Sequence, residues 1–290
     1  MSNIKIQQNL PQNLKLLTAQ RQLYSEAKKI RNIRILGTTL LTIISPLIFF
    51  FTTKLIIPLA IIGCLWSIFA FVIKSIENDK KKSAALIQEE FDTSVYNLPW
   101  NFILAKESCW PEKITSAERR YKADRKCLEN WYGDLKDLTY PLDILFCQRS
   151  NLVWDSRQRR SFALAIVVLL ILIFSAGIAL YWHSNKTISE YFLGILIPSL
   201  SAYFQGIDEI MGNFKDAFEK EGLEKRLEKL FREIKNSTSR AEYNKSELRQ
   251  IQDIIFKLRE NSPLIPDWWY KLFRNKYQLD MQATIDIFNS

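Results

Sequence analysis

Four stretches of this sequence are long and apolar enough to cross a lipid bilayer. A hydrocarbon core about 30 Å thick needs about 20 helical residues, and helices are expected because lipid cannot hydrogen-bond the backbone. The fourth stretch is the least apolar, since it contains Glu190 and Gln205, and Pro198 is expected to kink it. The sequence therefore predicts an all-α membrane protein with four transmembrane helices, at residues 35–53, 55–73, 161–182 and 188–207.

Short connections pair these helices into two hairpins, at 35–73 and 161–207. Lysine and arginine are strongly segregated: seven precede the first hairpin, sixteen lie between the hairpins and fifteen follow the second. The other two, Lys54 and Lys186, fall in the hairpin turns. Positive charge concentrates on the cytoplasmic side of membrane proteins. We therefore expect both termini and the middle segment to be cytoplasmic.

We expect the three segments outside the spans to be helical and cytoplasmic. The first, 1–34, is expected to be an amphipathic helix at the membrane interface, or alternatively an arm that binds lipid or a partner. The middle segment, 74–160, is rich in aromatic residues that a folded domain could bury, and has helical spacing from Ala117 to Trp131. The tail, 208–290, contains a charged helix with an apolar stripe and a second helix at about 245–260. The middle segment and the tail are expected to form one helical domain.

The composition argues against an enzyme. The eight glycines include no glycine-rich phosphate loop, and His183 is the single histidine. The four cysteines include no CxxC pair, so a zinc site has no support. Adjacent carboxylates such as Glu89 and Glu90 point apart on a helix and are expected to be surface charge. We expect no catalytic residue, no metal and no cofactor.

Arginine, tryptophan and asparagine side chains in the middle segment predict a ligand site. Guanidinium groups suit phosphate, aromatic faces stack on bases, and amides can read base edges, so the mixture fits a phosphorylated, base-containing ligand. Two alternatives remain open: arginines beside a span can serve as its anchor, and the tryptophans can be core residues. The candidate ligand-binding residues are Trp100, Asn101, Arg119, Arg120, Arg125, Arg149, Asn151, Trp154 and Asp155.

A polar stripe follows one face of the fourth span. From Glu190 through Pro198 to Asp208 its members recur at spacings of three and four, so they share one helix face. Polar residues in spans face protein or water. The stripe predicts either a pore lining in an oligomer or close packing of helices through small residues. The candidate pore-lining residues are Gly194, Ser201, Gln205 and Asp208.

Four segments of the chain resemble a known family. They are NLKLLTAQRQLYSEAKK before the first span, IQEEFDTSVYNLPWN after the second, CQRSNLVWDSRQRR before the third, and LRQIQDIIFKLRENSPLIPDWWY near the end. In this order around four spans, and over nearly the whole chain, they resemble the SMODS-associated four-transmembrane effector family. The combination of LPWN with CQRxNxxWD is fairly specific.

The resemblance implies an anti-phage effector of the bacterial inner membrane. Such an effector would bind a cyclic di- or trinucleotide made by a synthase of the SMODS class, then oligomerise or open to break the permeability barrier and arrest the infected cell. A nucleic acid polymer is not an expected partner. On this hypothesis Arg149 and part of the basic run 119–125 hold phosphates, and Trp100 or Trp154 stacks on a base. The alternative is a constitutive membrane scaffold whose cytoplasmic helices dock a partner protein.

Overall fold

The computed structural model describes residues 3–52, 54–133, 135, 138–183, 185–236, 245–269 and 272, apart from the side chain of Trp154. Within these residues the regular elements are helices, and none is a strand. The predicted all-α fold class is therefore confirmed.

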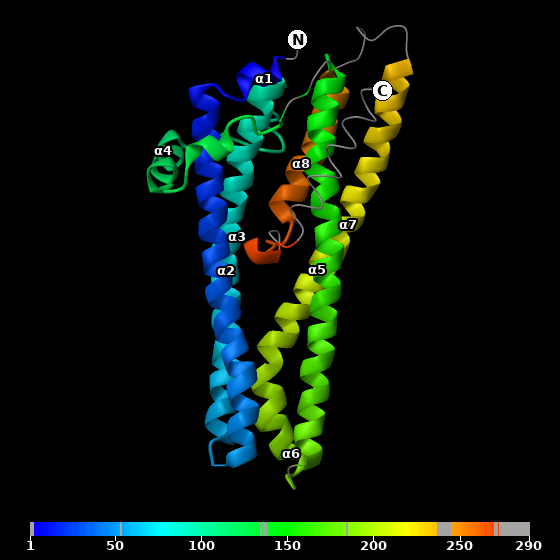
Figure 1. Cartoon of the computed structure of the whole chain (residues 1–290). Coiled ribbons are helices and arrows are strands. Elements are labelled where there is room, and N and C mark those ends of the chain that lie inside the picture. Colours follow the sequence, from blue (N-terminus) through cyan, green and yellow to red (C-terminus); the bar gives the residue numbers. More distant parts are fainter. Residues whose placement is uncertain are drawn as a thin grey trace. The chain divides into compact units, whose positions relative to one another are not determined.

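Long helices of 40 to 42 residues dominate the described chain. Each joins an apolar run to a polar run without a break. In the first of them the join, AKKIRNIRIL, contains no proline or glycine that would stop a helix, so the predicted boundary after residue 34 lies inside one continuous element. These helices are α2 Pro11–Phe51, α3 Ile56–Tyr96, α5 Leu142–His183 and α7 Ile197–Asn236 (Figure 1).

The remaining elements are short. A helix expected from Ala117 to Trp131 ends at Arg120 instead, because Tyr121 takes an extended conformation. Asp124 then caps a separate turn by accepting a hydrogen bond from the backbone N–H of Lys126. The helix expected at about 245–260 is present. The short elements are α1 Ile4–Gln7, α4 Pro111–Arg120, the 3-10 turn η1 Arg125–Leu128, α6 Ile188–Tyr191, the π-helical turn η2 Phe192–Leu196, and α8 Lys245–Asn261.

The chain forms two compact units. We call Met1–Glu26, Lys80–Arg159 and Lys215–Ser290 the polar unit, and Ala27–Asp79 with Arg160–Phe214 the apolar unit. The bounds of α2, α3, α5 and α7 show that each of these helices contributes to both units.

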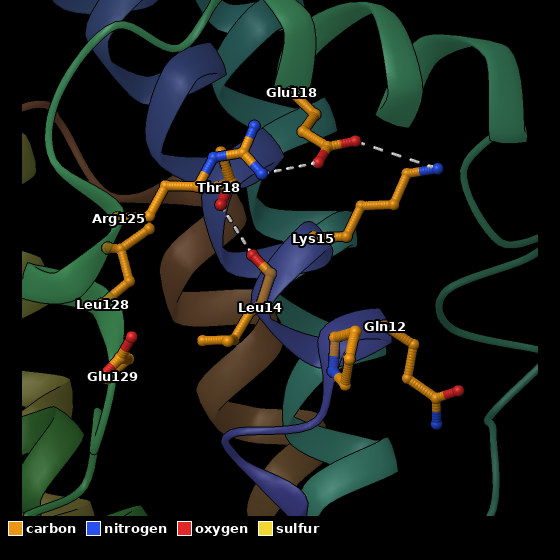
Figure 2. Close-up of a pocket in the computed structure, with 9 residues that line it drawn as sticks. Gln12, Leu14, Lys15, Thr18, Glu118, Arg125, Leu128 and Glu129 are labelled. Atoms are coloured by element: carbon orange, nitrogen blue, oxygen red, sulfur yellow. Dashed lines mark hydrogen bonds and ion pairs between the residues drawn. The ribbon is translucent and has the colours of Figure 1, made fainter.

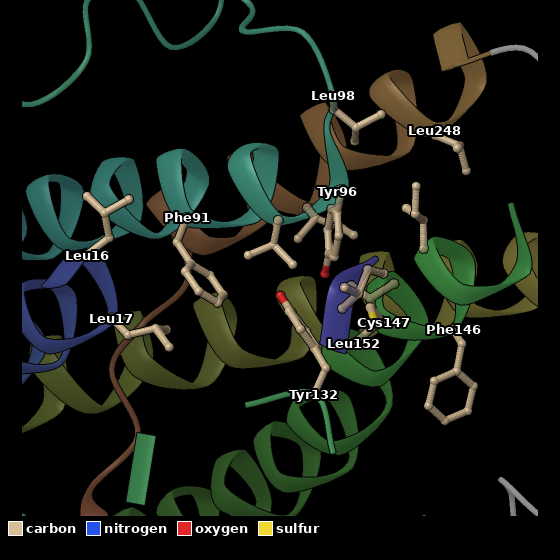
Figure 3. Packing of buried hydrophobic residues seen from close by; sticks show 14 of the residues in the cluster. Leu16, Leu17, Phe91, Tyr96, Leu98, Tyr132, Phe146, Cys147, Leu152 and Leu248 are labelled. Carbon is tan, nitrogen blue, oxygen red and sulfur yellow. The ribbon is translucent and has the colours of Figure 1, made fainter. Parts of the chain in front are cut away.

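The core of the polar unit draws on all three of its chain segments. Leu17 of α2 and Phe91 of α3 are completely buried in one apolar cluster, together with Leu152 of α5 (Figure 3). The ring of Tyr132 stacks on that of Phe91, with centroids 6.2 Å apart. Leu227 of α7 belongs to the same cluster. The N-terminal segment, expected to be an interfacial helix, thus packs into a protein core.

Buried charges attach α8 to α3 in the polar unit. Arg249 of α8 binds Glu89, and Arg259 binds Asp92. Gln252 donates hydrogen bonds to both carboxylates, 2.7 Å to Glu89 and 3.1 Å to Asp92. Burial raises the pKa of Glu89, although the Arg249 charge opposes that shift. Glu89 is 1% exposed, so the expectation of a surface carboxylate is wrong at this position, because a cation on α8 neutralises it.

The apolar unit presents aliphatic and aromatic side chains outwards, such as Leu36 and Leu47 on α2 and Phe71 on α3. Among the described helices, α2, α3 and α5 are long and apolar enough to cross a membrane, and they contain residues 35–51, 56–73 and 161–182 of the predicted spans 35–53, 55–73 and 161–182. The turns after Phe51 and after His183 lie at the same end of the unit (Figure 1).

The fourth predicted span, 188–207, is divided among α6, η2 and the start of α7. Pro198 has no N–H to donate to the helix ladder, and the π-helical turn Phe192–Leu196 lies just before it. None of these three elements is among the described helices with the length and apolarity of a span. A fourth crossing therefore stays a prediction.

Candidate ligand-binding site

A pocket of about 500 Å³ opens in the polar unit (Figure 2). The first turns of α2, the helix α4 and the turn η1 form its walls. Natural ligand sites span about 300–1,000 Å³, so the volume suits a small molecule. The lining residues are Pro11, Gln12, Leu14, Lys15, Thr18, Glu118, Arg125, Leu128 and Glu129.

Glu118 lies between the two cations of the pocket. Nη1 of Arg125 donates to its Oε1 at 3.1 Å, and Nζ of Lys15 lies 4.0 Å from its Oε2 (Figure 2). The side chains of Lys15 and Arg125 are 40% and 61% exposed. Because exposed ion pairs are weak, both cations can exchange Glu118 for an anionic ligand at small cost.

The walls combine these charges with apolar surface. Leu14 and Leu128 supply aliphatic side chains, while the Thr18 hydroxyl donates to the carbonyl of Leu14 at 2.7 Å. Cations suit phosphate groups, and aliphatic walls suit the face of a base or sugar. The described residues include no group of three His, Cys, Asp or Glu side chains that could hold a metal. The arrangement fits binding of an organic phosphate.

Hydrogen bonds between distant segments hold the pocket walls together. Asn9 donates its Nδ2–H to Oδ1 of Asn130 at 2.9 Å, and the backbone N–H of Asn130 donates to Oδ1 of Asn9 at 2.9 Å. The backbone N–H of Tyr132 donates to Oε1 of Gln8 at 2.9 Å. These bonds fix the chain before Pro11, where α2 begins, against the segment that follows η1. The pocket is therefore held together by residues as far apart in the sequence as Asn9 and Asn130, which are separated by 121 positions.

One predicted ligand residue, Arg125, lines the pocket. Sequence reasoning missed Lys15, Gln12 and Thr18, because the N-terminal segment was expected at the membrane surface. Its positive charge, which raised the alternative of a binding arm, was the available signal.

Arg119 and Arg120 lie outside the pocket lining. Arg119 is exposed, whereas Arg120 donates from Nε to Glu26 at 2.7 Å and from Nη1 to Ser116 at 2.6 Å. Lys80 also binds Glu26, at 2.6 Å. Burial alone would raise the pKa of Glu26, but these hydrogen bonds outweigh it and lower the pKa to about 2. Arg120 thus joins α4 to α2 in this structure.

Trp100 and Asn101 order the loop after α3. The indole Nε1–H of Trp100 donates to the carbonyl of Lys106 at 2.9 Å. Oδ1 of Asn101 accepts the backbone N–H groups of Ile103 and Leu104, and its Nδ2 donates to Asp253 at 2.9 Å. The polar atoms of both residues are therefore engaged within the protein.

The predicted residues of α5 contact other helices. Arg149 binds Glu224 at 3.1 Å and Glu228 at 2.5 Å, both on α7. Asn151 donates to the hydroxyl of Tyr132 at 3.4 Å. The structure does not bring these side chains to Arg125, since they have no part in the pocket lining. Their role in ligand binding stays a prediction.

Asp155 belongs to a buried charge cluster. It accepts hydrogen bonds from Arg159, at 2.7 Å, and from Lys220. Burial alone would raise the pKa of Asp155, but these two cations hold it well below its usual range. The side chain of Trp154 lies outside the described residues.

The family model of the SMODS-associating 4TM effector domain matches residues 2–288. The chain belongs to the SMODS-associating 4TM effector family. A probable CBASS effector molecule of Bacillus cereus (strain VD146) is 32% identical over 279 residues, which cover 93% of this chain and 92% of that protein. No solved structure matches the chain. The resemblance in the sequence is confirmed, and the chain is a membrane effector of anti-phage defence.

The predicted pore residues of this effector lie in its apolar unit. Gly194 is buried against Phe49 of α2, whose Cδ2 lies 2.5 Å from the place that a Cβ at Gly194 would occupy. Ser201 is 5% exposed and Gln205 is half-buried, whereas Asp208 is exposed and binds Lys74 at 2.5 Å. Gly194 and Ser201 are thus covered within one chain, and pore lining by the four residues stays a prediction.

Buried ion pairs join three helices of the effector's apolar unit. Arg31 of α2 binds Glu209 of α7 at 3.2 Å, and Arg34 of α2 binds Glu77 of α3 at 2.9 Å. Arg34 also lies 3.8 Å from Glu209. All of these side chains are at most 8% exposed. The sequence indicated only that the arginines flank a span, because their partners are distant along the chain.

Proposed function

We propose that the effector binds a cyclic oligonucleotide in the polar-unit pocket and then opens or oligomerises to permeabilise the bacterial inner membrane, arresting the infected cell. One observation carries the proposal: α2 supplies Lys15 and the neighbouring wall of the pocket, and the same unbroken helix contains the first membrane-capable run. A ligand that moves the start of α2 therefore acts on a helix of the apolar unit.

The ligand's phosphates would replace Glu118 as the partner of Lys15 and Arg125. A ligand shifts a conformational equilibrium only if it binds the two states differently. Rupture of the Glu118 ion pairs supplies such a difference, because Lys15–Glu118 is one of the contacts between α2 and α4 and Arg125–Glu118 joins α4 to η1. The chain's part is binding and opening, and we propose no catalytic step, metal or cofactor. A cyclic-nucleotide synthase of the SMODS class is the proposed functional partner.

The proposed topology places the polar unit and both termini in the cytoplasm, where the second messenger is made. The distribution of lysine and arginine supports it, since all but two of them lie outside the hairpin turns and spans. The fourth crossing, at 188–207, is part of this proposal.

The test is ligand-dependent ion flux in liposomes that contain the inserted protein, with a panel of cyclic di- and trinucleotides. We expect one of them to start the flux. Lys15→Ala with Arg125→Ala should reduce the apparent affinity at least tenfold, whereas Lys126→Ala, a neighbouring exposed cation outside the lining, should not. Flux lost in Arg149→Ala but kept in the Lys15/Arg125 variant would move the site to α5. No flux with any nucleotide would contradict the proposal.

A constitutive scaffold is the second candidate, because the loop after α3 exposes large apolar side chains. Phe102 is 73%, Ile103 96% and Trp110 71% exposed. Exposed apolar groups of this kind are typical of protein-binding surfaces. A scaffold would bind a protein partner through this loop and would not respond to any nucleotide, which the same liposome assay distinguishes.

A further inference from the structure

Helix α2 carries a buried polar face within the apolar unit. The face consists of positions separated by three or four residues, so its members lie on one side of the helix. Its last position, Phe49, is completely buried. Aliphatic neighbours on other faces, such as Ile43 and Leu47, are exposed. The polar positions are Arg31, Arg34, Thr38, Thr42 and Ser45, all at most 8% exposed.

A second polar face, on η2 and α7, lies opposite the first. The two faces meet at both ends: Phe49 contacts Gly194, and Arg31 binds Glu209. The residue numbers rise from Arg31 to Phe49 on α2 but fall from Glu209 to Gly194 on the other face. The two helices are therefore antiparallel. With Pro198 included, the positions from Gly194 through Ser201 and Gln205 to Glu209 are separated by four, three, four and four residues, so they follow one side of the helix.

Three polar groups on these faces have no protein partner. Oγ of Ser45, Oγ of Ser201 and Nε2 of Gln205 are buried without a hydrogen bond to any residue that the structure describes. Ser45 is 0% and Ser201 5% exposed. Buried polar groups are nearly always hydrogen-bonded, and polar groups at membrane depth face protein or water. Close packing alone would need only alanine or glycine here, so the hydroxyls and the amide indicate contact with water or ions.

The two ends of this polar line differ in the structure. At one end the Phe49 ring fills the space beside Gly194, with Ile195 and Ile56 in the same apolar cluster. At the other end the line continues into charged groups, where Arg31 and Arg34 are neutralised by carboxylates of α7 and α3. An apolar plug at one end of a line of polar groups is the arrangement expected of a gated path.

We propose that water and small monovalent ions cross the membrane inside each chain, between α2 and α7, and that Phe49 closes this path. The inference deepens the proposed function, on which its opening by a ligand rests. It differs from a pore between copies of the chain, because Ser201 and Gly194 are covered within one chain and the outward faces are apolar.

The first test needs no ligand: potassium flux through liposomes containing Phe49→Ala. We expect a flux at least tenfold above wild type, and the same from Gly194→Ala, whose new Cβ would displace the Phe49 ring. Phe50→Ala is the matched control, since Phe50 is the adjacent residue and is 49% exposed; it should stay at the wild-type level. Adding Ser45→Leu to Phe49→Ala should return the flux to the wild-type level, whereas adding Ile43→Leu should not.

The second test measures access of a charged, thiol-specific methanethiosulfonate reagent, with Cys64 replaced by serine and the modified residue located by mass spectrometry. In the Phe49→Ala background, Ser45→Cys and Ser201→Cys should react, while Ile43→Cys on the outward face should not. With Phe49 present all three should be protected. Reaction at Ile43→Cys alone would place the path between copies and overturn the proposal. Absence of reaction at all three sites would show close packing and overturn it as well.

The two proposals fail separately. If wild type responds to no cyclic oligonucleotide, the proposed function is contradicted, yet the flux of Phe49→Ala still decides the path. In the converse case a nucleotide opens wild type, while Phe49→Ala and Gly194→Ala, both inserted, pass no more potassium than wild type without a nucleotide. That result would contradict the path inside the chain and leave the ligand response intact.

Discussion

Arg34 directs two nitrogens, Nε at 3.1 Å and Nη2 at 2.9 Å, to a single carboxylate oxygen of Glu77. The pair joins α2 to α3 and is nearly inaccessible to solvent, with side chains 4% and 6% exposed. A buried ion pair is costly to break because the remaining charge keeps its desolvation penalty.

Arg34→Ala should therefore lower the free energy of unfolding in detergent by about 3–5 kcal/mol. Lys74→Ala is the control: its pair with Asp208 is 34% and 57% exposed, so the loss should be below about 1 kcal/mol. Replacement of both Arg34 and Glu77 by methionine should recover much of the loss. If Arg34→Ala were as stable as wild type, the Arg34–Glu77 pair would contribute nothing to the free energy of unfolding.

Leu17→Ala should destabilise the polar unit by about 2–5 kcal/mol, because it leaves a cavity at a completely buried position of α2. Ile6→Ala, at a position 65% exposed, is the control and should change stability by less than about 0.5 kcal/mol. Thermal unfolding of the detergent-solubilised protein measures both. Equal melting temperatures would favour the interfacial-helix interpretation of the N-terminal segment.

Arg249→Leu should loosen α8 by leaving Glu89 buried without its cation, at a cost of about 3–5 kcal/mol. We expect amide hydrogen exchange in α8 to accelerate by a hundredfold or more, while the start of α5 is less affected. Lys257→Leu, at an exposed position of the same helix, should leave the exchange rates unchanged. Unaltered exchange in Arg249→Leu would show that apolar contacts alone hold α8.

Glu26 makes stability depend on pH in the acid range. Its pKa is about 2 in the folded protein, against an ordinary value of 4.5, so its contribution is complete above about pH 4.5 and is lost as the pH falls towards 2. The melting temperature of wild type should fall more steeply between these values than that of Glu26→Gln. The exposed Glu112→Gln is the control and should follow wild type. Parallel curves for wild type and Glu26→Gln would contradict this role of the Arg120 and Lys80 contacts.

Glu118→Gln should tighten binding of an activating cyclic oligonucleotide, since it removes a negative charge that competes for Lys15 and Arg125. For such exposed charges the gain should be about two- to fivefold in the dissociation constant. Isothermal titration with the detergent-solubilised protein measures it, with Glu112→Gln as the control. Weaker binding to Glu118→Gln would indicate that the carboxylate contacts the ligand directly.

The long helices were predictable because apolar runs of bilayer length are a local property of the sequence. The helix from Lys245 was equally visible from its own spacing. The fourth span was less predictable. Glu190 lowers its apolarity, and Pro198 removes one hydrogen bond from its helix ladder.

The site was only partly predictable because its side chains acquire their roles from distant partners. Arg149 and Arg125 look alike in the sequence, yet one meets two glutamates of α7 and the other faces a pocket. Lys15 was overlooked, since nothing local distinguishes a pocket lysine from one at a membrane surface. Glu89 was misjudged for the same reason: its neutralising cation lies 160 positions away.

The core of the polar unit combines Ile4 and Leu17 with residues as late as Leu258. During synthesis the first residues leave the ribosome long before the last, and both apolar hairpin regions are made between them. The N-terminal part of α2 therefore lacks most of its packing partners while the later apolar segments are made. Assembly of the polar unit is thus the final step of biosynthesis, so a newly made chain completes this core only after its apolar segments have been made.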